Sequence, residues 1–117
     1  MYVEIDLAGK SRKLRYDFNA LADIEERAGL GIGAIFSEQR VGFHSIRLLL
    51  WGGLKWQDRG LTLERAGKIV GDYLRDGGTL EVLMDKVRQA LRKSGVMDFK
   101  EVEEEGDEGN AEAETAN

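Results

Sequence analysis

Polar and apolar side chains alternate along residues 2–18, and this period-two pattern constrains the N-terminal part of the fold most strongly. Residues 8–11 interrupt the alternation and supply a turn. The apolar face of the two flanking segments consists of Val3, Ile5, Leu7, Leu14, Tyr16 and Phe18. Alternation on both sides of a short turn predicts a β-hairpin with one half-buried face.

The pattern then changes to helical spacing. Apolar residues recur every three or four positions in the segments 19–29, 43–57, 62–75 and 79–94. A fifth segment, 30–36, is a short apolar connection in which a further helical turn could begin at Ile32. The predicted fold class is therefore α+β and mainly α-helical, with an N-terminal β-hairpin packed on three to four helices.

Candidate capping residues mark the ends of these helices. Asn19, Thr62 and Thr79 stand where a side-chain oxygen would accept from an unpaired backbone N–H. Gly29 stands where a residue in the left-handed region ends a helix. Gly52 and Gly53, inside the segment 43–57, predict either the close approach of another backbone or a kink.

Charge divides the chain into two parts. Nine of the 22 acidic residues and one of the 17 basic residues lie in 98–117, leaving 13 acids and 16 bases in residues 1–97. The formal charges are therefore −8 for the acidic segment 98–117 and +3 for the remainder. Because 98–117 is also poor in apolar residues, we expect a single globular domain over 1–97 and a disordered acidic tail over 98–117.

The residue types do not assemble into a catalytic site. The chain has no cysteine and one histidine, His44, beside Phe43. Asp23, Glu25 and Glu26 are expected on the solvated side of a helix, where carboxylates have no proton-transfer partner. No spacing is typical of metal ligands or of a phosphate-binding loop. We therefore expect a non-enzyme with no catalytic, cofactor-binding or metal-binding residues.

Membrane association is not expected either. No stretch of the sequence reaches the roughly 18 consecutive apolar residues that a membrane helix needs. The first residues resemble neither a signal peptide nor a transit peptide.

The oligomeric state is a separate question. The sequence has more apolar residues than one core needs, which favours self-association into a homo-oligomer.

Large apolar residues in the segment 43–57 are the candidate partner contacts. Trp51 and Trp56 lie about 140° apart on a straight helix, so one buried stripe does not accommodate both. Tryptophan is enriched at protein interfaces. The candidate partner-binding residues are Phe43, Leu50, Trp51 and Trp56, with core packing as the alternative for most of them.

Basic residues gather on the predicted hairpin. Arg12, Lys13 and Arg15, together with Lys10, are candidate contacts for an acidic partner. A solvated hairpin face is the alternative. We do not expect nucleic acid as the target, because the helix pair 62–75 and 79–94 has acids where a recognition helix would face phosphate.

The order of these segments resembles a known family. The stretch Phe18–Gly29 (FNALADIEERAG), the apolar run Leu48–Leu54 (LLLWGGL), the segment Leu61–Glu64 (LTLE) and the closing Val87–Leu91 (VRQAL) carry the resemblance. They are similar to the tail assembly chaperones of long-tailed phages, prophages and gene transfer agents. The resemblance covers about residues 1–97, and its motifs are structural rather than catalytic.

The resemblance implies a non-enzymatic assembly factor in the cytoplasm of a bacterial host. Such proteins bind the tape measure protein, keep it soluble and help to recruit tail tube subunits. Two alternatives stay open: a tail structural component retained in the particle, and a small nucleic-acid-associated regulator. Affinity that falls steeply with salt would distinguish the regulator.

Overall fold

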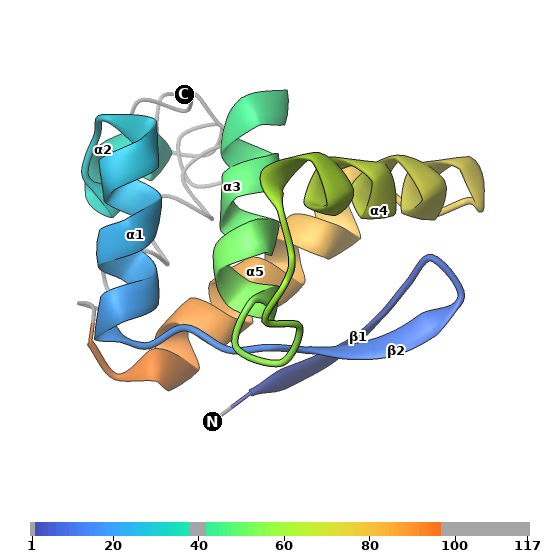
Figure 1. Cartoon of the computed structure of the whole chain (residues 1–117), viewed down its shortest axis with the longest axis horizontal. Coiled ribbons are helices and arrows are strands. Elements are labelled where there is room, and N and C mark those ends of the chain that lie inside the picture. Colours follow the sequence, from blue (N-terminus) through green and yellow to red (C-terminus); the bar gives the residue numbers. More distant parts are fainter. Residues whose placement is uncertain (1, 38–41, 97–117) are drawn as a thin grey trace, which may run out of the picture.

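The computed structural model describes residues 2–37 and 42–96, and it confirms the α+β, mainly helical fold class (Figure 1). A two-stranded hairpin precedes five helices in the described residues. The strands are β1 (Val3–Leu7) and β2 (Lys10–Leu14), and the helices are α1 (Phe18–Ala28), α2 (Ile32–Ser37), α3 (Phe43–Leu54), α4 (Leu63–Arg75) and α5 (Leu80–Ser94). The predicted acidic tail, 98–117, lies outside the described residues.

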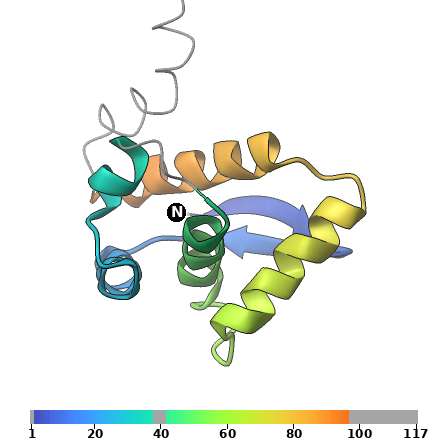
Figure 2. The same cartoon turned by 90° about the horizontal axis from the view of Figure 1, so that it is seen from above.

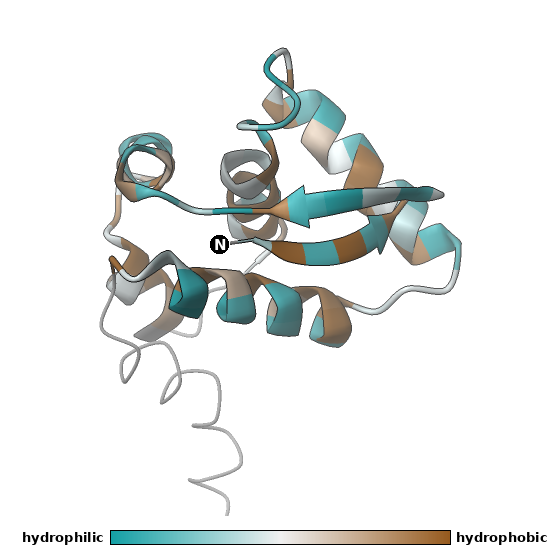
Figure 3. Ribbon diagram, turned by 90° about the horizontal axis from the view of Figure 1, so that it is seen from below, coloured by the Kyte–Doolittle hydropathy of each residue, from teal (hydrophilic) through white to brown (hydrophobic). Residues whose placement is uncertain are grey.

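The hairpin forms as the alternation predicts. Its strands pair in antiparallel register, with Val3 opposite Leu14 and Leu7 opposite Lys10. Ala8 and Gly9 both have positive φ, 54° and 74°, as a tight two-residue hairpin turn requires. Figure 3 shows the regular alternation of hydrophobic and hydrophilic residues along β1, whereas β2 is hydrophilic up to Leu14.

The turn after α3 covers the outer edge of β2. The backbone N–H of Lys13 donates to Gln57 Oε1 at 3.3 Å, and the Lys13 carbonyl oxygen accepts from Trp56 Nε1 at 3.1 Å. Both backbone groups of Lys13 therefore point away from β1 and are satisfied by side chains. The hairpin is held to the helical part of the molecule by its backbone as well as by its apolar face.

Helix α3 is the centre of the fold. Figure 1 shows α1 and α2 on one side of α3 and α4 on the other, with α5 crossing behind. Seen from above, the hairpin lies between α5 and the elements α3 and α4 (Figure 2). Side chains from every one of these elements enter a single core cluster.

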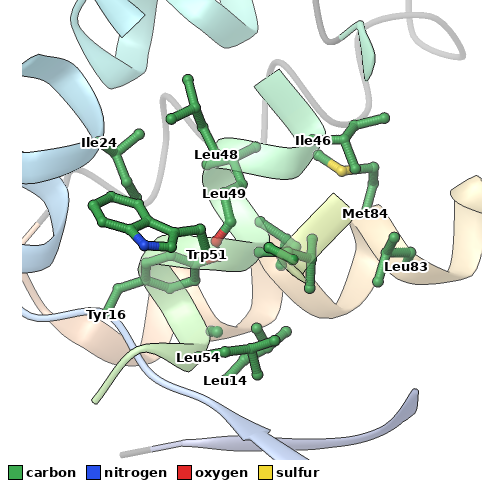
Figure 4. Close-up of a cluster of buried hydrophobic side chains, with 14 of the residues drawn as sticks. Leu14, Tyr16, Ile24, Ile46, Leu48, Leu49, Trp51, Leu54, Leu83 and Met84 are labelled. Atoms are coloured by element: carbon green, nitrogen blue, oxygen red, sulfur yellow. Dashed lines mark hydrogen bonds between the residues drawn. The ribbon is translucent and has the colours of Figure 1, made fainter. Parts of the chain in front are cut away.

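The core around α3 consists of apolar side chains together with Tyr16 and Trp51, whose polar groups are hydrogen-bonded. Leu14, Ile24, Leu49 and Leu83, which come from four different elements, are all fully buried there (Figure 4). The Tyr16 hydroxyl donates to the Leu49 carbonyl oxygen at 2.6 Å, so this buried hydroxyl is satisfied. Burial raises the pKa of the Tyr16 phenol far above its usual value.

The predicted start of α1 was wrong. Asp17, not Asn19, is the N-cap, and its side chain accepts from the Ala20 N–H at 2.8 Å. The helix therefore begins at Phe18, which is 72% exposed instead of joining the apolar face of the hairpin. The predicted end is confirmed, because Gly29 has φ 73° and its N–H bonds the Glu25 carbonyl.

Helix α2 begins at Ile32, the position where the sequence indicated that a further helical turn could start. Its first backbone N–H, at Ile32, donates to Glu25 Oε2 at 2.8 Å. A carboxylate from the preceding helix thus satisfies an N-terminal amide and complements the helix dipole. The local residue pattern indicated the start of this helix, whereas the contact with Glu25 could not be read from it.

The remaining helices differ from prediction mainly at one boundary. Helix α3 ends at Leu54 rather than at residue 57, and Trp56 lies in the turn that follows. Thr62 and Thr79 cap α4 and α5 as predicted, accepting from Arg65 and Val82 N–H. Each helix in the described part of the chain is too short or too polar to cross a lipid bilayer.

Candidate partner-binding surfaces

Leu50 and Trp51, two of the four predicted partner-binding residues, are buried in the core. Trp51 Nε1 donates to the Leu61 carbonyl oxygen at 3.1 Å, which ties α3 to the segment before α4. The charged groups of Arg27 and Lys55 lie over its ring, at 4.7 Å and 5.2 Å from the centroid. Neither Leu50 nor Trp51 therefore presents its side chain as an anchor for a partner.

Phe43 is the opposite case. It is the first residue of α3 and is 81% exposed. It stands at the rim of a recess of about 320 Å³ where the N-terminal half of α3 meets α4 and the start of α5. This surface, the apolar groove, is lined by Phe43, His44, Ile46, Arg47, Gly67, Val70 and Leu80.

Among the described residues that line the apolar groove, Arg47 is the one strong cation. Its Nη2 contacts His44 Nδ1 at 2.9 Å, and its Nε is buried with no hydrogen-bond partner in the described part of the chain. No described carboxylate pairs with it. Gly67 makes room for its stem, because a Cβ at that position would lie 3.1 Å from Arg47 Cδ. The groove therefore combines apolar walls with an uncompensated positive charge.

Trp56 lies on a different surface, on the outer side of the hairpin. It is 36% exposed and stacks on Tyr2, with 6.4 Å between the ring centroids. Lys13 Nζ lies 4.7 Å from the centre of the Tyr2 ring, and the Arg15 guanidinium lies 5.0 Å from that of Trp56. We call Tyr2, Lys13, Arg15 and Trp56 the aromatic–basic patch.

Arg12 does not join Lys13 and Arg15. In the hairpin register Arg12 is opposite Ile5, so it belongs to the face that carries Leu14. It lines a polar recess of about 330 Å³ between β2 and the turn after α3. This basic pocket is formed by Lys10, Ser11, Arg12, Leu54, Gln57, Asp58 and Arg59. The predicted basic cluster is thus divided between two surfaces.

Carboxylates and the histidine have structural contacts. Asp23 pairs with Lys55 Nζ at 2.8 Å, and Glu25 caps α2. His44 contacts Arg47. Among the described residues there is no group of three or more His, Cys, Asp or Glu side chains that could hold a metal ion.

Sequence reasoning missed several residues of these surfaces, among them Arg47, Gly67 and Arg59. Arg47 and Gly67 lie on different helices, and only the crossing of α3 and α4 brings them together. Arg59 belongs to a turn and carries no periodic signal. The separation of Arg12 from Lys13 and Arg15 could have been found, because even and odd positions of a strand point to opposite faces.

Comparison with known family models, curated proteins and solved structures yields no match. Three candidate binding surfaces lie on the part of the chain that the structure describes. They are an apolar groove that contains Arg47, an aromatic–basic patch on the outer hairpin face, and a basic pocket beside β2. Each surface favours a binding partner of different chemistry.

Proposed function

We propose that this protein is a non-enzymatic phage tail assembly chaperone, which acts in the cytoplasm of a bacterial host. It binds the tape measure protein, keeps it soluble and helps to recruit tail tube subunits. The resemblance of its segment order to that family supports the proposal. The structural observation that carries it is the apolar groove, because Phe43 stands 81% exposed at the rim of that recess.

The chemistry of the apolar groove favours a helical ligand. An amphipathic helix binds a groove by inserting apolar side chains spaced three or four residues apart. Phe43, Ile46, Val70 and Leu80 provide apolar contacts for such side chains. Arg47 provides a site for a carboxylate on the same helix, and a charge-assisted bond to guanidinium is among the stronger hydrogen bonds.

A tape measure protein fits this ligand class, because it is long and helical and exposes apolar surface until the tube closes around it. One groove of about 320 Å³ supplies only a modest contact. Many copies on one rod supply avidity, because several weak sites that bind at once hold the rod more tightly than any single site does. The acidic segment 98–117 would keep the coated rod soluble through like-charge repulsion.

The experiment is co-expression of this chain with the tape measure protein from the same genome. The readouts are the soluble yield of the tape measure protein and the mass of the purified complex. Phe43→Ser is compared with Phe18→Ser, because both phenylalanines are highly exposed, at 81% and 72%, and Phe18 lies outside the groove. Neither change should alter stability by more than about 0.5 kcal/mol.

We expect several copies of the chain per soluble rod with the wild-type protein and with Phe18→Ser. Loss of the exposed aromatic contact at the groove should weaken binding by roughly tenfold or more in Phe43→Ser. A tape measure protein that stays insoluble beside the wild-type chain would overturn the proposal. Mass spectrometry of purified particles provides a second test, since a chaperone is absent from them and a retained tail component is present.

The aromatic–basic patch favours a second candidate function, that of a small nucleic-acid-associated regulator. Stacked Tyr2 and Trp56, flanked by Lys13 and Arg15, resemble the platforms on which bases stack beside phosphate contacts. Such binding would fall steeply with salt and would weaken in Trp56→Ala. A fluorescence titration against single-stranded and duplex DNA at two salt concentrations distinguishes this function from the chaperone.

A further inference from the structure

The basic pocket carries an excess of positive charge that the described residues do not neutralise. Lys10, Arg12 and Arg59 line it, and none of them forms an ion pair with a described carboxylate. Its one carboxylate, Asp58, is already paired with Arg65 Nη2 at 3.2 Å. The recess therefore has unmatched positive charge.

Arg12 is held in a position to bind an anion. Its Nε donates to the Leu7 carbonyl oxygen at 3.2 Å, which fixes the guanidinium plane beside the hairpin turn. The two terminal nitrogens of Arg12, Nη1 and Nη2, have no hydrogen-bond partner among the described residues. Two parallel N–H groups are the donor arrangement that matches a carboxylate. Lys13 and Arg15, by contrast, lie over aromatic rings.

The chain itself contains the matching anion. The segment 98–117 carries nine carboxylates and one lysine, whereas the rest of the chain has an excess of three positive charges. Twenty residues span up to roughly 70 Å when extended, which exceeds the 46 Å longest dimension of the structure. A short tether also presents its ligand at an effective concentration in the millimolar range.

We propose that the basic pocket binds the acidic segment 98–117 of the same chain. The segment then occupies Lys10, Arg12 and Arg59 until a more acidic or better-shaped partner displaces it. This intramolecular contact involves neither the apolar groove nor a tape measure protein, so its test can fail or succeed separately from that of the proposed chaperone function. An acidic partner would have to compete with the tethered segment for the basic pocket, so only a partner of sufficient affinity would displace it.

Zero-length carbodiimide crosslinking of the full chain tests the proposal, because it joins only amines and carboxylates in contact. Lys10 is the one lysine among the described residues that line the pocket. We expect a crosslinked peptide that joins Lys10 to 98–117, at several-fold higher yield than for Lys86 on α5. The Lys55–Asp23 and Lys68–Asp72 pairs, at 2.8 Å and 3.1 Å, should crosslink in every sample and serve as internal standards.

Mixing isotopically labelled and unlabelled chains identifies the source of the segment. Crosslinks within one isotope class support the proposal. Mixed-isotope crosslinks would show that the pocket is occupied by a second copy, and they would overturn it. Raising the salt concentration from about 0.1 M to about 1 M shortens the screening length from about 10 Å to about 3 Å, so the Lys10 crosslink should fall several-fold.

Matched variants separate a specific site from general attraction. The double change Arg12→Gln and Arg59→Gln should lower the Lys10 crosslink several-fold, and so should neutralising Glu103, Glu104 and Glu105 to glutamine in the otherwise wild-type chain. The control is Lys86→Gln with Arg88→Gln on α5, which removes the same charge outside the pocket. Equal yields in the pocket and control variants would refute the proposal.

Discussion

The backbone amide of Arg15 donates a hydrogen bond to the carbonyl oxygen of Gly53, with 2.9 Å between nitrogen and oxygen. This bond joins the chain leaving β2 to the last turn of α3. It requires the two backbones to approach closely, which is one of the two roles that the sequence predicts for the pair Gly52 and Gly53. A Cβ at Gly52 would overlap the Ile24 side chain, so that glycine is equally confined.

We expect Gly53→Ala to destabilise the protein by roughly 1–2 kcal/mol. A Cβ there would lie 2.8 Å from Tyr16 Cζ and 2.9 Å from Leu14 Cδ2, both in the core. Overpacking of this kind costs about 1–3 kcal/mol, which exceeds the ~1 kcal/mol that alanine contributes to a helix. Urea unfolding monitored by circular dichroism measures this change as a shift of the midpoint urea concentration, provided that the m-value stays constant.

Gly71→Ala in α4 is the matched control and should change stability in the opposite direction. Its Cβ would lie 3.6 Å from Arg75 Nη2, an ordinary contact with a flexible group. The helix propensity of alanine should then stabilise the protein by up to about 1 kcal/mol. Equal effects of the two substitutions would contradict the close packing of α3 against the hairpin.

Tyr16→Phe should cost roughly 1–2 kcal/mol near neutral pH. The change removes the 2.6 Å bond to the Leu49 carbonyl from a buried site. Because burial raises the pKa of Tyr16 in the folded state, its contribution is complete below the unfolded pKa of about 10 and is lost as the pH rises towards the folded value. The difference between wild type and Tyr16→Phe should therefore shrink above about pH 10, as urea unfolding at several alkaline pH values would reveal.

Asp72 should support α4 at neutral pH and lose that role in acid. Arg75 and Lys68 donate to its carboxylate at 2.6 Å and 3.1 Å, and these bonds lower its pKa. The contribution is complete above the unfolded pKa near 3.8 and disappears as the pH falls through the lower folded pKa. Carbon-13 NMR titration reports the pKa, and Asp72→Asn should approach wild-type stability at the acid end.

The two tryptophans should respond differently to truncation. Trp51→Ala empties a core position and removes the bond to the Leu61 carbonyl, so it should cost roughly 3–5 kcal/mol. Trp56→Ala removes a stacking contact at the surface and should cost roughly 1 kcal/mol. Chemical denaturation compares them directly. If Trp51→Ala lost partner binding while keeping wild-type stability, its placement in the core would be wrong.

Local patterns predicted most of the fold. Alternation located the hairpin, apolar stripes located four helices, and Thr62, Thr79 and Gly29 marked ends that the structure confirms. Boundaries that depend on competing caps were less predictable. Asp17 and Asn19 are both good N-caps, and only the packed structure selects Asp17.

The candidate surfaces were less predictable, because they form between elements. Helical spacing separated Trp51 from Trp56 correctly, but it could not show that α3 ends before Trp56. The exposure of Phe43 and the burial of Leu50 depend on which side of α3 meets α4 and α5. The places of Arg47 and Arg59 on these surfaces depend on how separate elements pack together, and the spacing of residues in one sequence does not indicate that packing.

The side-chain bonds at Lys13 matter for a protein proposed to work in many copies on one rod. A two-stranded sheet has open edges, and an open edge can template pairing by a neighbouring chain. At Lys13 the amide and carbonyl that would recruit another strand are already engaged by Gln57 and Trp56. When copies crowd together, a neighbouring strand therefore cannot pair with the hairpin at Lys13, which disfavours growth of the hairpin into a fibre.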